Sequence, residues 1–298
     1  MMHRLRLRPV LCGSWEELRS AGAVLALVGE SDWEEGQAAL AKEEGILLLR
    51  LGEGQLCPYQ PADRLLKAVY ALAAEQQLYL PGALHMLYER EVVAVCSPHG
   101  YDLQTGFALV YSLIRAEKKR TLYLDFSYYS GFFGTDFRDV GDLIYEMHRE
   151  TVPMQTVLAA LTQTLGQLDY IPAVRAQMDL DDLTGKDFTE LLRRVLQESE
   201  YELVVLNLPV RPLFLRAVYN CCDRMYSLQR EGTLYDRAQA RLLEDLGLES
   251  GQKELSNLKI VPMPAMSGSF SMDASMYEAM LLGDMAAFVR EIVGREVL

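Results

Sequence analysis

The repeated alternation of short apolar segments with helical segments limits the possible folds of this 298-residue chain more than any other feature. From residue 91 onward, the apolar segments read as strands over 91–97, 121–126, 202–208, 225–228 and 258–262. Helical patterns separate them: one begins near Gln104, a long one covers about 140–197 with an interruption near 170–172, and others cover 213–220 and 234–246 before a C-terminal helix. This order predicts an α/β fold with a doubly wound, mostly parallel sheet and right-handed crossovers.

A smaller α/β pattern precedes this one. Strands are expected over 5–7, 23–28 and 46–49, with helices over 32–44 and 62–76. Pro81 and Gly82 break the pattern after the second helix. Because the chain is longer than one hydrophobic core usually allows, we predict a small α/β domain over 1–76, a linker over 77–90 and a larger domain over 91–298.

The composition favours a soluble, cytoplasmic protein. Apolar residues make up 50% of the chain, charged residues 24%, and the net charge is −13. This charge repels nucleic acids and anionic lipids, and the densest basic stretches, 3–8 and 118–120, are short enough to be solvated edges or turns. The N-terminal region has no apolar signal core, and no run approaches the roughly 18 apolar residues of a membrane span.

Cysteine and histidine give no sign of a catalytic or metal centre. The five cysteines are odd in number and lack a CxxC pair, which argues against a disulfide framework or structural zinc. Cys221 and Cys222 are expected to be buried thiols rather than nucleophiles. The four histidines are scattered along the sequence.

The loop after the strand over 91–97 is where a ligand is expected, since doubly wound sheets bind ligands at the carboxyl ends of their strands. It reads Ser97-Pro98-His99-Gly100-Tyr101-Asp102-Leu103-Gln104-Thr105. This loop resembles the deviant phosphate-binding loop of MinD/ParA ATPases, which runs lysine, two glycines, any residue, glycine, lysine, and threonine or serine. In this register His99 and Gln104 replace the two lysines, Tyr101 and Leu103 replace two glycines, and the residues retained are Gly100 and Thr105.

These replacements remove what phosphate binding needs. Backbone amides approach a phosphate closely where glycine leaves no Cβ, and Tyr101 and Leu103 add bulk there. Gln104 carries no charge for the β- and γ-phosphates, and His99 is mostly neutral at pH 7. Thr105 could hold Mg²⁺ only together with phosphates. An ordinary strand-to-helix turn explains Gly100 and Thr105 equally well.

Two later strands depart from the family pattern in the same direction. The strand over 121–126 resembles the one that carries two aspartates in the family; Asp125 is retained and Ser127 replaces the second. Asp125 could also be only a capping residue. Asn207 stands at the family's magnesium-side aspartate and offers Mg²⁺ no carboxylate. The degenerate site therefore predicts no catalytic residue and no cofactor. Any ATP–Mg²⁺ binding would be weak, with Thr105 and Asp125 beside the metal.

The order of the two predicted domains resembles the CpaE/TadZ family, which is associated with positioning and assembling tight-adherence (Flp-type) pili. The segments that carry this resemblance are 58–66, 142–145, 169–172 and 201–207. It implies that the first domain is a truncated receiver-like domain. That domain has no acidic pair after its first strand, so docking is more natural for it than phosphorylation.

The leading hypothesis is a non-hydrolysing adaptor that binds protein partners in a pilus or other polar assembly, reaching the cell pole or the inner face of the membrane through them. Relatives dimerise across the nucleotide, so either a constitutive dimer or a monomer is compatible with its loss. One rival is a partitioning or localisation ATPase with weak ATP binding and residual hydrolysis.

Another rival is a membrane- or DNA-associated ATPase, for which the C-terminal helix over 272–298 is informative. It has an apolar stripe, but two arginines stand against five acidic residues. Such a helix should pack on the chain's own sheet or on a partner rather than on lipid. The aromatic residues Tyr128, Tyr129, Phe132 and Phe133 could pack internally, cover the site or form a partner surface.

Overall fold

The structure is a computed structural model that describes residues 10–34, 37, 41, 43–52, 56–75, 83–100, 103–128, 130, 132, 138–149, 152–248, 257–264 and 277–296. The chain divides into two compact units, Met1–Leu87 and Tyr88–Leu298. This division lies inside the predicted linker, and the linker contains a short helix, α4 (Ala83–Tyr88).

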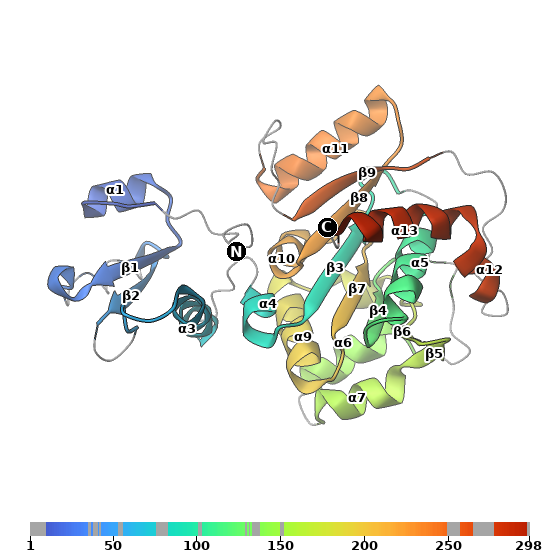
Figure 1. The fold of residues 1–298 in the computed structure, drawn as a ribbon, viewed down its shortest axis with the longest axis horizontal. Coiled ribbons are helices and arrows are strands. Elements are labelled where there is room, and N and C mark those ends of the chain that lie inside the picture. Colours follow the sequence, from blue (N-terminus) through green and yellow to red (C-terminus); the bar gives the residue numbers. More distant parts are fainter. Residues whose placement is uncertain are drawn as a thin grey trace. The chain divides into compact units, whose positions relative to one another are not determined.

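The first unit is a small α/β layer structure (Figure 1). Its two strands, β1 (Leu25–Gly29) and β2 (Leu47–Leu51), are parallel. Helix α3 (Ala62–Glu75) packs on them through a cluster of apolar side chains that includes Leu49, Val69 and Tyr70. A second cluster joins β1 to helix α1 (Trp15–Ser20). A short 3-10 turn, η2 (Glu30–Asp32), follows β1. The predicted strand over 5–7 lies outside the described residues, and the receiver-like character of this unit remains a prediction.

The second unit is built on a seven-stranded sheet with the order β5-β6-β4-β7-β3-β8-β9 (Figure 1). Neighbouring strands are parallel throughout, except for β5 and β6, which form an antiparallel pair. The prediction of an α/β fold with a doubly wound, mostly parallel sheet is therefore confirmed. The strands are β3 (Glu91–Cys96), β4 (Thr121–Asp125), β5 (Gln163–Leu165), β6 (Leu168–Ile171), β7 (Leu203–Asn207), β8 (Arg224–Gln229) and β9 (Leu258–Pro262).

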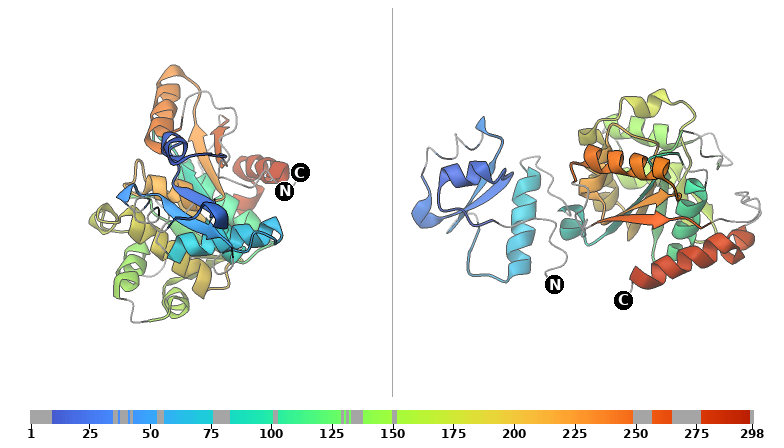
Figure 2. Two further views of the ribbon diagram at one scale, coloured as in Figure 1. Left: turned by 90° about the vertical axis from the view of Figure 1, so that its left-hand side faces the viewer. Right: turned by 90° about the horizontal axis from the view of Figure 1, so that it is seen from above.

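Helices cover both faces of this sheet, as its strands require: consecutive residues of β3, such as Val92 and Val93, are both fully buried. On one face, α5 packs against β3, β4 and β7, and α12 and α13 pack on α5. On the other face, α10 contacts β3, and α11 contacts β8. Both views in Figure 2 show α11 and the C-terminal helix on opposite sides of β8 and β9. The helices are α5 (Gln104–Ala116), α6 (Val140–Arg149), α7 (Met154–Leu161), α8 (Met178–Asp181), α9 (Gly185–Glu198), α10 (Leu215–Cys221), α11 (Thr233–Leu246), α12 (Tyr277–Leu282) and α13 (Asp284–Glu296).

The expectation of a helical stretch over about 140–197 was wrong in its middle, where the chain forms the β5–β6 hairpin. Gly166 adopts a left-handed φ of 62° in the turn, and Leu165 lies opposite Leu168. The ring of Tyr277 packs so closely on this glycine that a Cβ would lie 2.5 Å from its Cζ. Pairing of β6 with β4 completes the hairpin's hydrogen bonding. Tertiary contacts therefore decided the conformation of this short segment.

The C-terminal helix α13 packs on α5 through one apolar stripe. Met285, Ala286 and Val289 are at most 2% exposed. This is the packing on the chain's own domain that the acidic balance of the helix favoured. Among the residues described, no helix is both long and apolar enough to cross a membrane.

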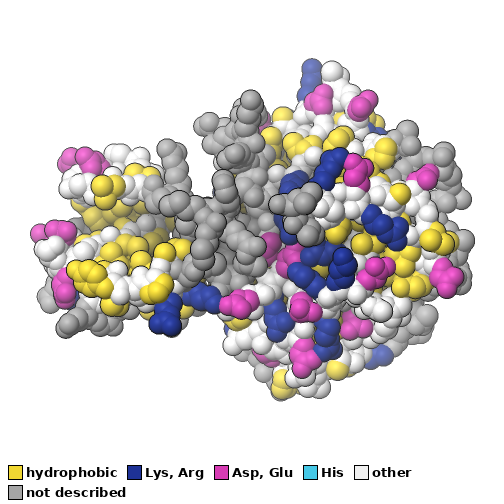
Figure 3. Space-filling model, in the orientation of Figure 1, with side chains coloured by type: hydrophobic (Ala, Val, Ile, Leu, Met, Phe, Trp, Pro, Cys, Tyr) yellow, Lys and Arg dark blue, Asp and Glu magenta, His cyan; other side chains and the backbone are white. Residues whose placement is uncertain are grey.

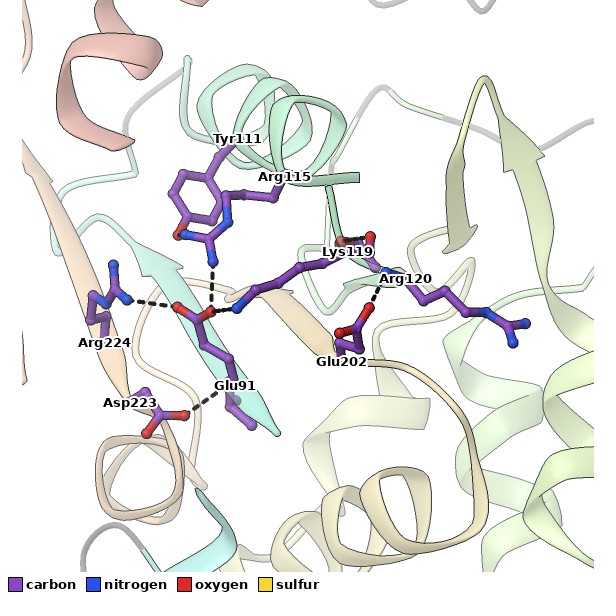
Figure 4. A network of polar contacts seen from close by, with 10 residues as sticks. Glu91, Tyr111, Arg115, Lys119, Arg120, Glu202, Asp223 and Arg224 are labelled. Carbon is purple, nitrogen blue, oxygen red and sulfur yellow. Dashed lines mark hydrogen bonds and ion pairs between the residues drawn. The ribbon is translucent and has the colours of Figure 1, made fainter. Parts of the chain in front are cut away.

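At the amino end of the sheet, one buried carboxylate collects three cations (Figure 4). Glu91 opens β3, and its Oε2 accepts hydrogen bonds from Arg115 (2.6 Å) and Lys119 (2.8 Å), while Oε1 accepts one from Arg224 (2.7 Å). Burial would raise the pKa of Glu91, but these cations outweigh it and the pKa is lowered. The cluster joins β3, β8, α5 and the turn after α5.

Elsewhere on the larger unit, basic and acidic side chains are interspersed. Figure 3 shows Lys and Arg next to Asp and Glu across the visible face of this unit. The basic stretch 118–120 follows this pattern, because Lys119 binds Glu91 and Arg120 pairs with Glu200. Such mixed surfaces produce no large field of one sign.

Truncating the stripe of α13 tests its contribution to stability. We expect Met285→Ala to lower the free energy of unfolding by about 2–4 kcal/mol, because it opens a cavity against α5. Leu282→Ala is the control, since Leu282 is 83% exposed and its truncation should cost less than about 0.5 kcal/mol. Urea unfolding followed by far-UV circular dichroism measures both. Both tryptophans, Trp15 and Trp33, lie in the first unit, so tryptophan fluorescence reports on the unfolding of that unit. The fluorescence transition should therefore be the same in wild type and in both variants. Equal losses in the two variants would contradict the packing.

Removing the charge of Glu91 should be costly. Glu91→Gln leaves Arg115 and Arg224 without their carboxylate and should lower the free energy of unfolding by about 3 kcal/mol at neutral pH. Glu200→Gln, which breaks an exposed pair, should cost less than about 0.5 kcal/mol.

The effect of Glu91→Gln should also depend on pH. A lowered folded-state pKa means that Glu91 stabilises the fold above its ordinary value of 4.5, and that this contribution is lost as pH falls through the folded-state pKa. The difference between wild type and Glu91→Gln should therefore shrink at acid pH. A difference independent of pH in urea titrations would show that charge is not its cause.

Candidate functional site

The strand order places a topological switch point at the carboxyl edge of the sheet, between β3 and β7. The chain leaves β3 through α5 toward β4, and it leaves β7 through α10 toward β8, so the two connections run in opposite directions on opposite faces. A point of this kind is where doubly wound sheets bind ligands. The residues singled out from the sequence that the structure describes lie at this edge.

Residues 97–100, which follow β3, form a tight turn that fits their sequence. Gly100 has a left-handed φ of 67°, and its amide donates to the carbonyl of Ser97. The glycine is therefore explained by the backbone alone. Leu103 packs against the apolar core on the α5 side. Tyr101 lies outside the described residues.

His99 packs against Tyr235 of α11, with 4.7 Å between the ring centroids and the rings tilted by 54°. Its ring nitrogens also lie 3.4 Å from the hydroxyl of Ser97. Partial burial and the nearby Arg230 lower the pKa of His99. The imidazole is therefore neutral at pH 7 and supplies no positive charge to the loop.

Gln104, in the first turn of α5, turns inward and is bound by the protein itself. Its Nε2 donates to Oδ1 of Asn207 (2.7 Å) and to the carbonyl of Leu208 (2.7 Å). The carbonyl of Val95 lies 3.4 Å from the same nitrogen. Gln104 is 6% exposed, so its amide links the first turn of α5 to the end of β7 instead of facing solvent.

Asn207 is the centre of this network. It is fully buried at the end of β7, opposite Val95 of β3 and Asp125 of β4. Its Nδ2 donates to the Thr105 hydroxyl (3.1 Å) and to Oδ1 of Asp125 (3.0 Å). Both of its amide protons and its carbonyl oxygen are thereby used, which is what a buried amide requires.

Asp125 accepts hydrogen bonds from several groups of its own chain. Besides Asn207, the hydroxyl of Ser127 (2.6 Å) and its amide (3.0 Å) bind Oδ1, and the hydroxyl of Tyr123 binds Oδ2 (3.0 Å). Burial raises the pKa of Asp125, and hydrogen bonds led by that of Ser127 offset part of this rise. Ser127 therefore serves as a hydrogen-bond partner of Asp125.

The site thus brings together Gln104, Thr105, Asp125, Ser127 and Asn207, and it leaves His99 at its margin. Sequence analysis did not identify Tyr123 as a hydrogen-bond donor to Asp125. Its position two residues before Asp125 was the available signal, because residues i and i+2 of a strand share a face.

The polar groups in this cluster are amides, hydroxyls and one carboxylate. Thr105 and Asp125, the two positions that would flank a metal, are joined through Asn207. Over the residues that the structure describes, no three His, Cys, Asp or Glu side chains gather to hold a metal ion. These groups bind one another in a hydrogen-bond network.

The aromatic residues that follow β4 are only partly described. Phe132 is 1% exposed and packs on Tyr170, with 4.9 Å between the ring centroids. The hydroxyl of Tyr128 donates to Asp181 (3.2 Å). Tyr129 and Phe133 lie outside the described residues. For Phe132, internal packing is therefore the structural role.

Comparison with known proteins gives similarity to solved structures, while no protein-family model and no curated protein matches the chain. A ParA family ATPase from Chlorobium tepidum TLS is 16% identical, with a TM-score of 0.48 over 65% of this chain and 82% of that one. The MinC:MinD cell division protein complex of Aquifex aeolicus gives 14%, 0.43, 57% and 67% for the same quantities. Apo McdA from Cyanthece gives 14%, 0.46, 64% and 80%. Similarity at this level of identity carries no argument about activity.

Asn207→Asp tests the network by placing a second carboxyl beside Asp125. Two buried carboxylates at this separation cannot both ionise cheaply, so one pKa should rise strongly. A raised folded-state pKa gives stability that is present below the unfolded pKa and lost as pH rises through the folded value. We expect a loss of about 3 kcal/mol near pH 8 and a smaller loss near pH 5.

Asn220→Asp is the control for this substitution. Asn220 lies in the last turn of α10, away from the network, and the change should cost no more than about 1 kcal/mol. Urea unfolding at the two pH values measures both variants. If Asn207→Asp were as mild as the control at both, Asn207 would not be the buried partner of Asp125.

Proposed function

We propose that this protein is a non-hydrolysing MinD/ParA-like adaptor, a pseudo-ATPase whose phosphate-binding position is filled by its own side chains. The observation that carries the proposal is the pair of 2.7 Å hydrogen bonds from Gln104 to Asn207 and Leu208. They fix a neutral amide where the related loop has a lysine that reaches the phosphates.

The chemistry of phosphoryl transfer supports this reading. That reaction depends almost entirely on positioning and on cations that stabilise the phosphate charge. The one carboxyl group of the Asn207 network is Asp125, and its ionised form would repel a phosphate. Each electrostatic donor missing from an active site raises a barrier by about 3–4 kcal/mol, so the combined changes at 104, 127 and 207 are incompatible with useful hydrolysis.

The biological setting follows from the resemblance of the chain to the CpaE/TadZ family. We infer an adaptor that positions or assembles a Flp-type pilus or similar polar machinery through protein partners. The protein would act in the cytoplasm and reach the pole or the membrane's inner face through those partners. The first unit, receiver-like by resemblance and lacking an acidic pair, would serve as a docking module.

A weak ATP-binding partitioning or localisation ATPase is the second candidate. It is favoured by the retention of Thr105 and Asp125. Both residues lie at the carboxyl edge of the sheet and share Asn207 as a hydrogen-bond partner. A nucleotide would then have to displace Gln104 from Asn207 before its phosphates could reach α5.

Calorimetric titration of the full chain with ATP and Mg²⁺ separates the two candidates. The adaptor should give no binding heat at millimolar nucleotide and no phosphate release. Its urea midpoint should also stay unchanged, whereas a ligand at 100 times its Kd would add about 2.7 kcal/mol to the free energy of unfolding.

Thr105→Val supplies the matched comparison, with its stability measured first without nucleotide. In the adaptor, wild type and Thr105→Val should respond to ATP–Mg²⁺ identically. Micromolar binding by wild type that disappears in a folded Thr105→Val variant would establish the ATPase candidate instead.

A further inference from the structure

A cavity of about 200 Å³ lies at the ends of β3 and β7, beside α10 and α11, and Ser97 and Pro98 of the loop after β3 contribute to its lining. None of the residues of the Asn207 network lines it. Its apolar wall comes from the ends of β3 and β7 and from the two helices, and consists of Pro98, Pro209, Pro212, Leu215, Ala238 and Leu242. Cys96 also lines it, and burial raises the pKa of this thiol to about 12, so the cavity offers no thiolate.

The size of the cavity suits one side chain. A dry apolar cavity of about 150 Å³ holds benzene, whereas sites for drug-sized ligands span about 300–1,000 Å³. A leucine or an aromatic ring would therefore fill this space. A nucleotide would not fit in it.

Exposed apolar residues extend the cavity into a larger surface. Val210 (46% exposed) and Leu213 (81%) lie in the loop that supplies Pro209 and Pro212. Leu234 (72%) lies one helical turn before Ala238 on α11, and residues four apart share a helix face. Large apolar side chains exposed around a pocket are typical of protein-binding surfaces.

The charges at the cavity favour an acidic ligand. Two arginines and one aspartate line it: Arg211 pairs with Asp245 at 3.1 Å, and Arg241 makes no ion pair with any described residue. Both members of the Arg211–Asp245 pair are solvent-exposed, which makes the pair weak and easily exchanged. The cavity therefore carries a net positive charge on a chain whose total is −13.

We propose that this cavity, with Val210, Leu213 and Leu234, binds a short acidic segment of a partner protein that inserts one leucine or aromatic side chain. We call the surface the α11 pocket. The inference rests on the adaptor function, because it names the kind of partner such an adaptor would hold. Arg241 and Arg211 would bind carboxylates of the segment, and the prolines and leucines would surround its anchor.

Selection of peptides from a random phage-displayed library on the immobilised full chain tests the proposal. Enriched sequences should carry Asp or Glu beside one Leu, Phe or Trp. Synthetic copies of them should bind wild type in fluorescence anisotropy. Ala238→Trp, which fills the cavity from its wall, should weaken binding by about tenfold or more, and Arg241→Glu should do the same.

Matched controls come from α13. Ala287 and Arg290 are both exposed there, so Ala287→Trp and Arg290→Glu should bind the peptides as wild type does. Enrichment of peptides without acidic residues and an apolar anchor would overturn the proposal, and so would peptides that bind Ala238→Trp unchanged. Self-association lost in Ala238→Trp, without peptide binding, would show a second copy to be the occupant instead.

Measuring ATP binding and peptide binding together separates the α11 pocket from the adaptor function. ATP binding by calorimetry together with intact peptide binding would remove the adaptor function and leave the α11 pocket. Absence of both ATP binding and peptide binding would leave the adaptor function and remove the pocket.

Discussion

The carboxyl edge of the larger sheet depends on one buried amide. Asn207 receives a hydrogen bond from Gln104 and donates to Thr105 and Asp125, so it ties the first turn of α5 to the ends of β4 and β7. In a low-dielectric interior such a network is strong while every member is satisfied and costly once one is not. Each neutral residue in this site is therefore needed by its neighbours, and charge-bearing replacements would leave partners unsatisfied.

The two ends of the sheet are stabilised in different ways. At the amino end, Glu91 collects Arg115, Lys119 and Arg224, which is a charged cluster. At the carboxyl end, the Asn207 network consists of amides, hydroxyls and one carboxylate. The apolar strands between the two ends are buried on both faces. The carboxyl edge is thus held together by the chain's own side chains. The proposed adaptor function needs such an edge, because an adaptor presents a constant surface to its partners.

The strands and most helices of the larger unit could be predicted because long apolar runs and helical periodicity report burial directly. The β5–β6 hairpin could not, since its short strands depend on pairing with β4 and on the contact between Gly166 and Tyr277. Helix α1 was also missed, although Ser14 caps it by accepting a hydrogen bond from the amide of Glu17. For the site, the sequence identified the residues but not their connections. A sequence shows that residue 104 is neutral, but only the structure shows its amide on Asn207 and on the carbonyl of Leu208.

The most direct test of the central claim is a high-resolution crystal structure of the full chain grown with millimolar ATP and Mg²⁺. The account predicts that the Gln104 side chain lies within hydrogen-bonding distance of Asn207 and Leu208, with no nucleotide at the first turn of α5. Phosphate density at that turn, with Gln104 displaced from Asn207, would contradict it.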